Sequence, residues 1–275
     1  MPPLRPLNFR KESAMEPGTQ DMLDIAFDAA VQAGEIQREY YEKKNLDIEL
    51  KGRIDLVTEV DLLCEKAVTA TISESFPDHG ILAEEGTSIN GGSPYQWIID
   101  PLDGTTNFAH GFPMFAVSIG LVKDGEILLG VIYDPLRDEL FSAKKDGGAT
   151  MNGHSIKVSE TSQLDKSLVA TGFPYDVKTS SRNNLNNFNR VIMEVRALRR
   201  PGAAAIDLAY VACGRLDGFW EQRLKPWDMA AGALIVSEAG GIVTDMKGKP
   251  LDLFGETCCA GNPQIHPQLL ELLED

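Results

Sequence analysis

Apolar residues recur every three or four positions along residues 21–43 and again along residues 58–75. This spacing puts them on one face of an α-helix, so the pattern predicts two amphipathic helices near the start of the chain. Pro77 ends the second helix, because proline cannot continue the helical hydrogen-bond ladder. The apolar face of the first helix comprises Met22, Ile25, Ala29, Ala33, Ile36 and Tyr40.

Shorter apolar runs, rich in aromatic and β-branched residues, follow these helices. They predict strands, because they are too short for helices and are bounded by turn-forming sequences. The connection Lys123-Asp124-Gly125 is typical of a tight turn, so the neighbouring strands are expected to form an antiparallel meander. The first half of the chain is thus predicted to be an α+β layer. Its strands are residues 80–83, 97–99, 115–122, 127–133 and 139–143.

Strands and helices alternate after about Lys166, which predicts an α/β layer in the second half. No internal repeat and no linker rich in Gly, Ser or Pro separates the halves, so we expect them to share an interface. We predict a flexible extension at 1–18, an N-terminal subdomain at 19–160 and a C-terminal subdomain at 161–275. The later strands are residues 168–171, 218–220 and 242–245, and the helices are residues 181–195, 203–213 and 227–239.

One apolar run leads directly into acidic side chains. Trp97-Ile98-Ile99 is followed by Asp100, Pro101, Leu102, Asp103 and Gly104. Pro101 cannot continue a strand ladder, so the backbone is expected to turn there and to place both acids at the strand end. Carboxylates and carbonyls that converge in this way suit a hard cation such as Mg²⁺. Asp is also common in turns and caps, so this segment alone leaves a structural role open.

Further acids lie in similar places, and each has a structural alternative. Glu84 and Glu85 close an apolar strand, and Asp55 lies in a strand-like run at residues 52–57. Asp61 is explained by a capping box in which Thr58 caps the second helix. Asp228 opens an apolar helix, where it could simply favour the positive end of the helix dipole.

Composition limits the classes of protein to consider. The chain has 275 residues, 43% of them hydrophobic and 24% charged, as in an ordinary globular protein. Its 41 acidic and 26 basic residues give a net charge of -15, which disfavours a phosphate-tracking nucleic-acid surface. An anionic substrate would need bound cations to reverse the local charge.

Cysteine and histidine patterns exclude two further classes. Cys64, Cys213, Cys258 and Cys259 form no C-x-x-C pair or secreted disulfide framework, which predicts a reduced, cytoplasmic protein. The four histidines form no H-E-x-x-H motif, so a zinc hydrolase is not expected. No run approaches 18 apolar residues and the first residues lack the apolar core of a secretory signal, so no membrane association is expected.

Four motifs occur in order along the chain. They are Asp55-Leu56-Val57-Thr58-Glu59-Val60-Asp61, Ala83-Glu84-Glu85, the twelve residues from Trp97 to Phe108, and Trp227-Asp228-Met229-Ala230-Ala231-Gly232 followed by Glu238-Ala239-Gly240-Gly241. Together they resemble the motifs of the inositol monophosphatase family of magnesium-dependent, lithium-sensitive phosphatases, and the resemblance extends from about Asp21 to the C-terminus. It implies a layered α-β-α-β-α sandwich, shared with sugar bisphosphatases, with the active site between the halves.

The resemblance implies specific metal ligands. Glu84, Asp100 and the Leu102 carbonyl would hold one Mg²⁺. Asp100, Asp103 and Asp228 would hold a second, and Glu84 could reach a weaker third through water. Asp100 can bridge two cations, because a carboxylate has two oxygens with several lone pairs.

The resemblance also implies a mechanism of in-line attack by metal-activated water, without a covalent phosphoenzyme. Thr105, hydrogen-bonded to Asp55, would orient and help to deprotonate the water, with Glu84 contributing through the metal shell. Thr105 could alternatively, or in addition, cap the helix that begins near Thr106. The phosphate would lie on the backbone amides of Gly104 and Thr105.

Other residues would contact the substrate. By the same resemblance, Gly202, Ala203 and Ala204 approach the inositol or sugar ring, and Asp103 belongs to the substrate site. Glu221 and Asp228 would accept hydrogen bonds from the ring hydroxyls, although Glu221 could instead be a solvated acid after a strand. Many relatives carry Thr where this chain has Ala203, which affects substrate preference.

The resemblance favours hydrolysis of myo-inositol 1-phosphate by a cytoplasmic homodimer that contacts neither nucleic acid nor membrane. A fructose-1,6-bisphosphatase or a 3′-phosphoadenosine-phosphate phosphatase on the same fold is the nearest alternative. Arg199 and Arg200 bear on this choice, because they could pair with acids at a subunit interface, which we favour, or reach a second phosphate. A non-catalytic regulatory protein is a further alternative, but such a protein should have lost a site residue and none is missing.

Overall fold

The computed structural model describes the backbone of residues 18–46 and 53–273, and the side chains of residues 18–43 and 59–273. The predicted extension at 1–18 falls almost entirely outside these residues. The helices are α1 (Thr19–Leu46), α2 (Arg53–Ser75), α3 (Thr105–His110), α4 (Leu185–Val191), α5 (Ala204–Ala212), α6 (Pro226–Glu238) and α7 (Ile265–Leu272), with a 3₁₀ turn at Leu164–Lys166. The strands are β1 (Gly80–Ala83), β2 (Ser88–Ile89), β3 (Tyr95–Asp103), β4 (Ala116–Lys123), β5 (Glu126–Asp134), β6 (Glu139–Lys144), β7 (Ala149–Met151), β8 (His154–Ser155), β9 (Leu168–Thr171), β10 (Ala197–Arg199), β11 (Gly218–Gln222), β12 (Ile242–Thr244) and β13 (Thr257–Gly261).

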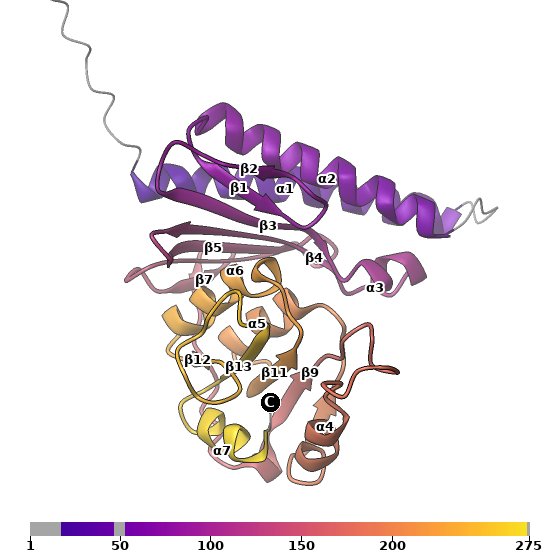
Figure 1. Cartoon of the computed structure of the whole chain (residues 1–275), viewed down its shortest axis with the longest axis vertical. Coiled ribbons are helices and arrows are strands. Elements are labelled where there is room, and N and C mark those ends of the chain that lie inside the picture. The colour runs from indigo at the N-terminus through magenta and orange to yellow at the C-terminus, as the bar shows by residue number, and fades with distance from the viewer. Residues whose placement is uncertain (1–17, 47–52, 274–275) are drawn as a thin grey trace, which may run out of the picture.

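Two sheets and three helical layers alternate through the molecule (Figure 1). The larger sheet has eight strands in the order β2-β1-β3-β4-β5-β6-β7-β8, and only β1 and β3 pair in parallel. The smaller sheet has five strands in the order β10-β9-β11-β13-β12. Helices α1 and α2 cover the outer face of the larger sheet, α5 and α6 lie between the sheets, and α7 and α4 lie beyond the smaller one (Figure 1). This is the α-β-α-β-α sandwich predicted from the sequence.

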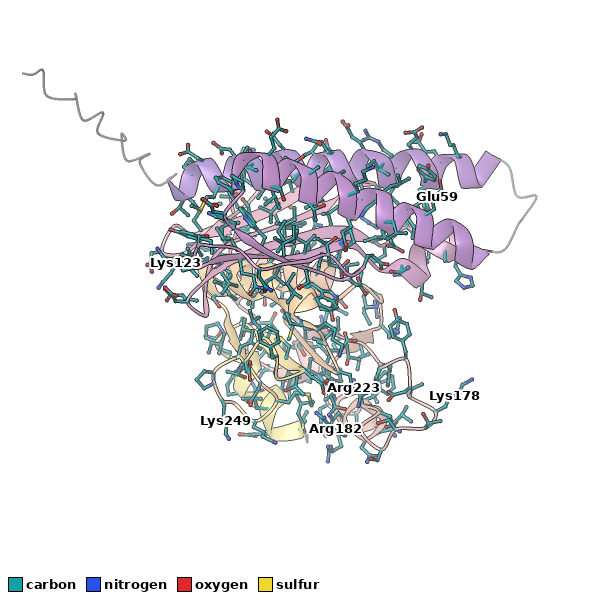
Figure 2. The ribbon with its side chains drawn as sticks, turned by 45° about the horizontal axis from the view of Figure 1, so that its top comes forward. Glu59, Lys123, Lys178, Arg182, Arg223 and Lys249 are labelled. Carbon is teal, nitrogen blue, oxygen red and sulfur yellow. The ribbon has the colours of Figure 1, made fainter. Side chains whose placement is uncertain are left out.

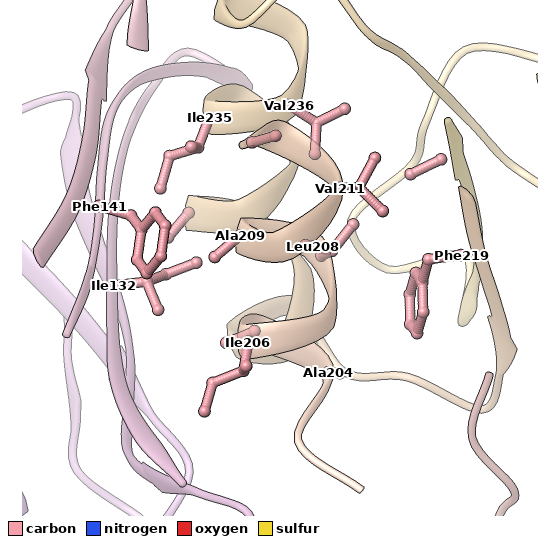
Figure 3. Close-up of a cluster of buried hydrophobic side chains, with 14 of the residues drawn as sticks. Ile132, Phe141, Ala204, Ile206, Leu208, Ala209, Val211, Phe219, Ile235 and Val236 are labelled. Carbon is pink, nitrogen blue, oxygen red and sulfur yellow. The ribbon is translucent and has the colours of Figure 1, made fainter. Parts of the chain in front are cut away.

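A continuous core joins the two sheets. Ile132 and Phe141 of the larger sheet and Phe219 of the smaller one are at most 1% exposed and pack on opposite sides of α5 (Figure 3). Helix α5 is apolar nearly all round, as expected for a helix that is buried on both faces. The halves are therefore joined by packing, and the division at residue 160 remains a prediction.

Several predicted elements needed correction. Helix α2 begins at Arg53, so Thr58 is not its cap and Asp55 lies in a helix rather than in a strand-like run. Strand β3 continues through Pro101 to Asp103, and its pairing with β4 shifts register between Asp100 and Asp103, where proline lacks the N–H for a ladder bond. Helix α4 is shorter than the predicted helix at 181–195. Strands β2, β7, β8, β10 and β13 and helix α7 were not predicted.

Among the helices of the described residues, none has the length and apolar character needed to cross a membrane.

Candidate active site

Three carboxylates converge where the larger sheet meets α6. Asp100 and Asp103 come from the end of β3, and Asp228 comes from the first turn of α6. Each offers one oxygen atom, and these three atoms lie within 4.8 Å of one another. Asp100 is 2% exposed and Asp103 is 8% exposed. Two neighbouring acids of β3 and a distant, partly buried acid of α6 thus form one cluster, as expected for the predicted metal site.

The backbone around Asp100 is fixed by its own side chain. Asp100 Oδ1 accepts a hydrogen bond of 2.9 Å from the Leu102 N–H, which holds the shift in register. The Leu102 side chain is fully buried, and the Leu102 carbonyl accepts a bond of 3.1 Å from the Thr105 hydroxyl. That carbonyl therefore lies at the site, next to the residue predicted to orient water.

Asp103 joins the two halves of the molecule. Its Oδ2 accepts a hydrogen bond of 2.7 Å from the Ala205 N–H in the first turn of α5. Burial and the charge of Asp228 raise the pKa of Asp103 to about 7, although the bonds from the Ala205 and Ala204 amides oppose that rise. The N-terminus of α5 thus provides part of the stabilisation that a buried carboxylate needs.

Asp228 both caps a helix and belongs to the cluster. Its Oδ2 accepts a hydrogen bond of 2.6 Å from the Lys225 N–H, as in a capping box. Burial raises the pKa of Asp228 to about 6, and Lys225 opposes the rise. The cap and the metal site are compatible, because a carboxylate has a second oxygen.

Glu84 reaches the cluster from β1. Parallel pairing sets Ala83 opposite Ile99, so Glu84 follows at the level of Asp100. The two carboxyl groups share a hydrogen bond, which raises the pKa of Asp100 and lowers that of Glu84. Nevertheless, limited contact with water and the charge of Asp228 raise the pKa of Glu84 to about 7. Burial and the charge of Glu84 raise the pKa of Asp100 well above its usual range.

These residues fit a hard divalent cation. The donor set contains only oxygen, which Mg²⁺ prefers, and burial raises the pKa of each of these carboxyl groups. Within the described residues, Asp100, Asp103 and Asp228 form no ion pair with Lys or Arg. A bound cation would supply the missing positive charge and return the pKa of each carboxyl towards its usual value.

Gly104 and Thr105 turn the chain from β3 into α3. Gly104 is the N-cap of α3 with a φ of 91°, and a Cβ there would lie 2.8 Å from the Met114 carbonyl oxygen. Only glycine fits both the conformation and the space. Thr105 is the first helical residue, so the alternative that it caps α3 is wrong. The first amides of a helix have no partner within the helix, which leaves them available to an anion.

A cavity of about 330 Å³ opens beside the carboxylates. It brings together most of the residues predicted to bind the substrate. Ala203 is not in the lining, because it is 1% exposed and its Cβ faces the position a Gly104 Cβ would occupy. The predicted residues in the lining are Asp103, Gly104, Gly202, Ala204, Glu221 and Asp228.

Glu221 projects from β11 into this cavity. Burial, with the charges of Asp228 and Asp103, raises the pKa of Glu221 to about 8, and Arg200 opposes the rise. Gly172 lies against the Glu221 carboxylate, since a Cβ at this glycine would be 2.1 Å from its oxygens. Any larger residue at 172 would displace Glu221.

The cavity also has an outer wall that the sequence reasoning missed. Tyr175 follows β9, is 95% exposed and lines the cavity. Next to it, Asp176 pairs with Arg223 at 3.2 Å. Arg223 lies in the half of the molecule that contains the smaller sheet (Figure 2). Arg223 has a φ of 68°, which is unusual for a residue other than glycine. The aromatic run after β9 was the only sequence signal for this wall.

The predicted role of Asp55 depends on a side chain outside the described residues. Its backbone belongs to α2, and its hydrogen bond to Thr105 stays a prediction. The described contact of the Thr105 hydroxyl is the Leu102 carbonyl.

The molecule is a sandwich of alternating helical and sheet layers, and carboxylates from both halves lie around its cavity. This combination is typical of a class of phosphate-ester hydrolases with a site for divalent cations. The model of the inositol monophosphatase family matches residues 19–275, and the chain belongs to that family. Relatives at 43% and 47% identity are named inositol-1-monophosphatase, and this protein is a phosphatase.

Individual relatives agree with this assignment. The inositol-1-monophosphatase of Synechocystis sp. is 47% identical over 256 residues, which cover 92% of this chain and 89% of the relative. Nus factor SuhB of Escherichia coli is 43% identical, with coverage of 92% and 96%. The solved inositol monophosphatase from Anabaena superposes with a TM-score of 0.85 at 44% identity, covering 92% of this chain and 95% of that structure.

Proposed function

We propose that this protein hydrolyses myo-inositol 1-phosphate to inositol and inorganic phosphate, and that it requires Mg²⁺. The observation that carries the proposal is the convergence of Asp100, Asp103 and Asp228 beside a cavity whose wall carries Glu221. The three carboxylates beside the cavity can bind cations that in turn bind phosphate. The acid in the cavity wall can accept hydrogen bonds from the hydroxyl groups of a polyhydroxylated alcohol. The relatives named inositol-1-monophosphatase support the same substrate.

Two Mg²⁺ ions would be held as the family resemblance implies, one by Glu84, Asp100 and the Leu102 carbonyl and another by Asp100, Asp103 and Asp228. Glu84 could reach a weaker third through water. When bound, these ions supply positive charge to the phosphate and make water more acidic. The chain itself contributes the amides of Gly104 and Thr105, which face the phosphate oxygens.

Thr105 orients the attacking water, and Asp55 and Glu84 help to accept its proton. The water oxygen bonds to phosphorus as the bond from phosphorus to the alcohol oxygen breaks, and the departing oxygen gains a proton. Gly202 and Ala204 lie in the cavity wall beside the inositol ring, whereas the Ala203 side chain is buried outside the lining, so the ring contact predicted for position 203 would not come from its side chain. Glu221 and Asp228 accept hydrogen bonds from the hydroxyl groups of the inositol ring.

Further properties belong to the same proposal. The four cysteines of the chain are free thiols, which supports a cytoplasmic location. We also propose a homodimer that Li⁺ inhibits, as the family resemblance implies. The net charge of -15 supports a protein that binds a small phosphate ester rather than nucleic acid directly.

A bisphosphate substrate is the second candidate. Arg200, Arg223 and Lys225 are exposed residues of the cavity lining, so they lie in its outer part. They could pair with a second phosphate, while Arg199 is not in the lining and bonds the Leu198 carbonyl. This placement favours a cavity role for Arg200, and the predicted subunit interface remains a prediction.

The experiment is a phosphate-release assay with saturating Mg²⁺. It compares myo-inositol 1-phosphate, fructose 1,6-bisphosphate and 3′-phosphoadenosine 5′-phosphate. The proposal expects the highest kcat/KM with inositol 1-phosphate. Release from none of the three would reject the catalytic role and favour a regulatory protein, whereas a higher value for a bisphosphate would select the second candidate.

A further inference from the structure

Glu65 is a buried acid outside the carboxylate cluster. It lies on α2, is 4% exposed, and faces the turn between β1 and β2. Its Oε2 accepts a hydrogen bond of 2.7 Å from the Glu85 N–H. Its Oε1 accepts bonds of 2.9 Å from the Thr87 N–H and 2.5 Å from the Thr87 hydroxyl. One side chain thus satisfies three donors of the turn.

The same turn carries Glu84. The Glu84 N–H bonds the Ile99 carbonyl at 3.2 Å, and the Ala83 N–H bonds the Thr87 carbonyl at 2.9 Å. These bonds tie the turn to β3 and close it on itself. Gly86 within the turn has a φ of 114°, a conformation that glycine adopts at little cost. The contacts with Glu65 come from a different layer of the fold.

A carboxylate is an unfavourable choice at this position unless its geometry is needed. Burial and then the negative charge of Glu65 raise the pKa of Glu85. Glu65 also contributes, after burial and other acids, to the raised pKa of Asp61 and Glu84. A glutamine would avoid that repulsion, but its amide nitrogen would face one of the N–H donors. Only a carboxylate has an acceptor oxygen at both terminal positions of the side chain. The negative charge of Glu65 is therefore retained, although it is unfavourable, because both oxygens are needed to hold the turn at Glu85 and Thr87.

We propose that Glu65 is a positioning residue for Glu84, which fixes the turn at residues 84–87 so that the Glu84 carboxylate lies against Asp100 for cation binding. The proposal rests on the proposed metal-dependent function. Acids beyond the direct ligands commonly orient them in this way, and their loss costs about 10–100-fold in metal affinity.

The test measures Mn²⁺ binding to the full-length protein by electron paramagnetic resonance of the free ion. Glu65→Gln is expected to weaken Mn²⁺ binding about ten-fold or more, and saturating Mg²⁺ should restore most of the kcat. Glu74→Gln is the matched control, because it removes the same charge from an exposed position on the same helix. A folded Glu65→Gln protein that binds Mn²⁺ like the control would overturn the proposal.

A second pair of variants keeps Glu65 itself in place. Thr87→Val removes the hydroxyl donor and is expected to weaken Mn²⁺ binding about two- to five-fold, whereas Thr87→Ser keeps the donor and should bind normally. Equal affinities for the Val and Ser variants would contradict the proposal, even if Glu65→Gln fails to fold. If the unaltered protein releases no phosphate, the proposed function is rejected but the proposal for Glu65 is not, because the Mn²⁺ affinities are measured without substrate.

Discussion

Asp103 caps a helix that belongs to the other half of the molecule. Its Oδ2 accepts the Ala205 N–H at 2.7 Å, at the second position of α5. The residue that should cap α5 is Ala203, which has the extended backbone of an N-cap but no side chain to accept a bond. A site carboxylate therefore does the work of the missing cap, which links the position of the cluster to the packing of the two halves.

This relationship predicts that the two roles of Asp103 can be separated. In an Asp103→Ala background, Ala203→Ser should stabilise the protein by about 1 kcal/mol, because the serine hydroxyl replaces the lost acceptor. In the protein that keeps Asp103, Ala203→Ser should stabilise the fold much less, because Asp103 already accepts the Ala205 N–H. Urea unfolding of the four proteins measures the coupling.

Activity should not follow stability in that series. Loss of the Asp103 carboxylate should lower phosphate release by on the order of 100-fold or more, and Ala203→Ser should not restore it. Asp103→Asn should behave in the same way as Asp103→Ala. Asp124→Asn is the control, since Asp124 is exposed in a turn with a φ of 52° that Asn tolerates. Near-normal turnover in Asp103→Asn would refute the metal assignment.

Gly104 provides a second prediction, with a matched glycine to test it. Gly104→Ala should cost about 2–4 kcal/mol, because it combines a positive φ with a Cβ 2.8 Å from the Met114 carbonyl oxygen. Gly125→Ala has a φ of 84° but meets no atom within 4 Å, so it should cost only about 1 kcal/mol. Urea unfolding measures both changes. Equal costs would show that the close approach at Gly104 contributes nothing.

Local sequence patterns predicted much of this fold. The long helices and the meander have strong periodicity and clear turn sequences, and the layered architecture followed from the family resemblance. The start of α2 was misplaced, because the capping pattern at Thr58 is also compatible with a helix interior. Strand β13 was missed, because Thr257-Cys258-Cys259-Ala260-Gly261 has little β-branched character and its pairing partner β11 lies far away in sequence.

The candidate site shows the same division between local and distant information. The acids of the central run were evident from their position after a strand. The acceptor role of Asp103 towards Ala205 could not be predicted, because it joins residues 102 positions apart. Tyr175 was missed for a similar reason, since a single exposed tyrosine gives no sign of the cavity it flanks. Long-range contacts of this kind appear only once the layers are packed.

The carboxylate cluster predicts an unusual dependence of stability on pH. The pKa values of Glu84 and Asp103 are raised to about 7 and that of Asp228 to about 6, against about 4 in an unfolded chain. The folded protein therefore holds more protons than the unfolded chain between these values. Without metal, the stability from this source should be greatest below about pH 4, where both states are protonated, and should fall as the pH rises from about 4 through 7.

Mg²⁺ should reverse this trend. It binds the deprotonated carboxylates, so its affinity and the rise in Tm that it causes should both be larger at pH 8 than at pH 6. Thermal unfolding with Mg²⁺ or with EDTA measures both effects. Asp100→Asn should flatten the pH dependence in EDTA. A Tm in EDTA that rises between pH 5 and pH 8 would show that the cluster does not govern the titration.

The outer part of the cavity yields the last prediction, which compares neighbouring arginines. Arg200 lines the cavity and Arg199 does not. If a second phosphate reaches the outer part of the cavity, Arg200→Gln should raise KM for fructose 1,6-bisphosphate about ten-fold, which is the loss of one charge-assisted hydrogen bond. We expect KM for inositol 1-phosphate to change by less than about two-fold, because that substrate has only one phosphate. Arg199→Gln should change neither value.

An equal rise in KM for both substrates in Arg200→Gln would instead indicate that Arg200 acts by stabilising Glu221, whose pKa it lowers. If the two arginines belong to a subunit interface, gel filtration should show a smaller species for both variants.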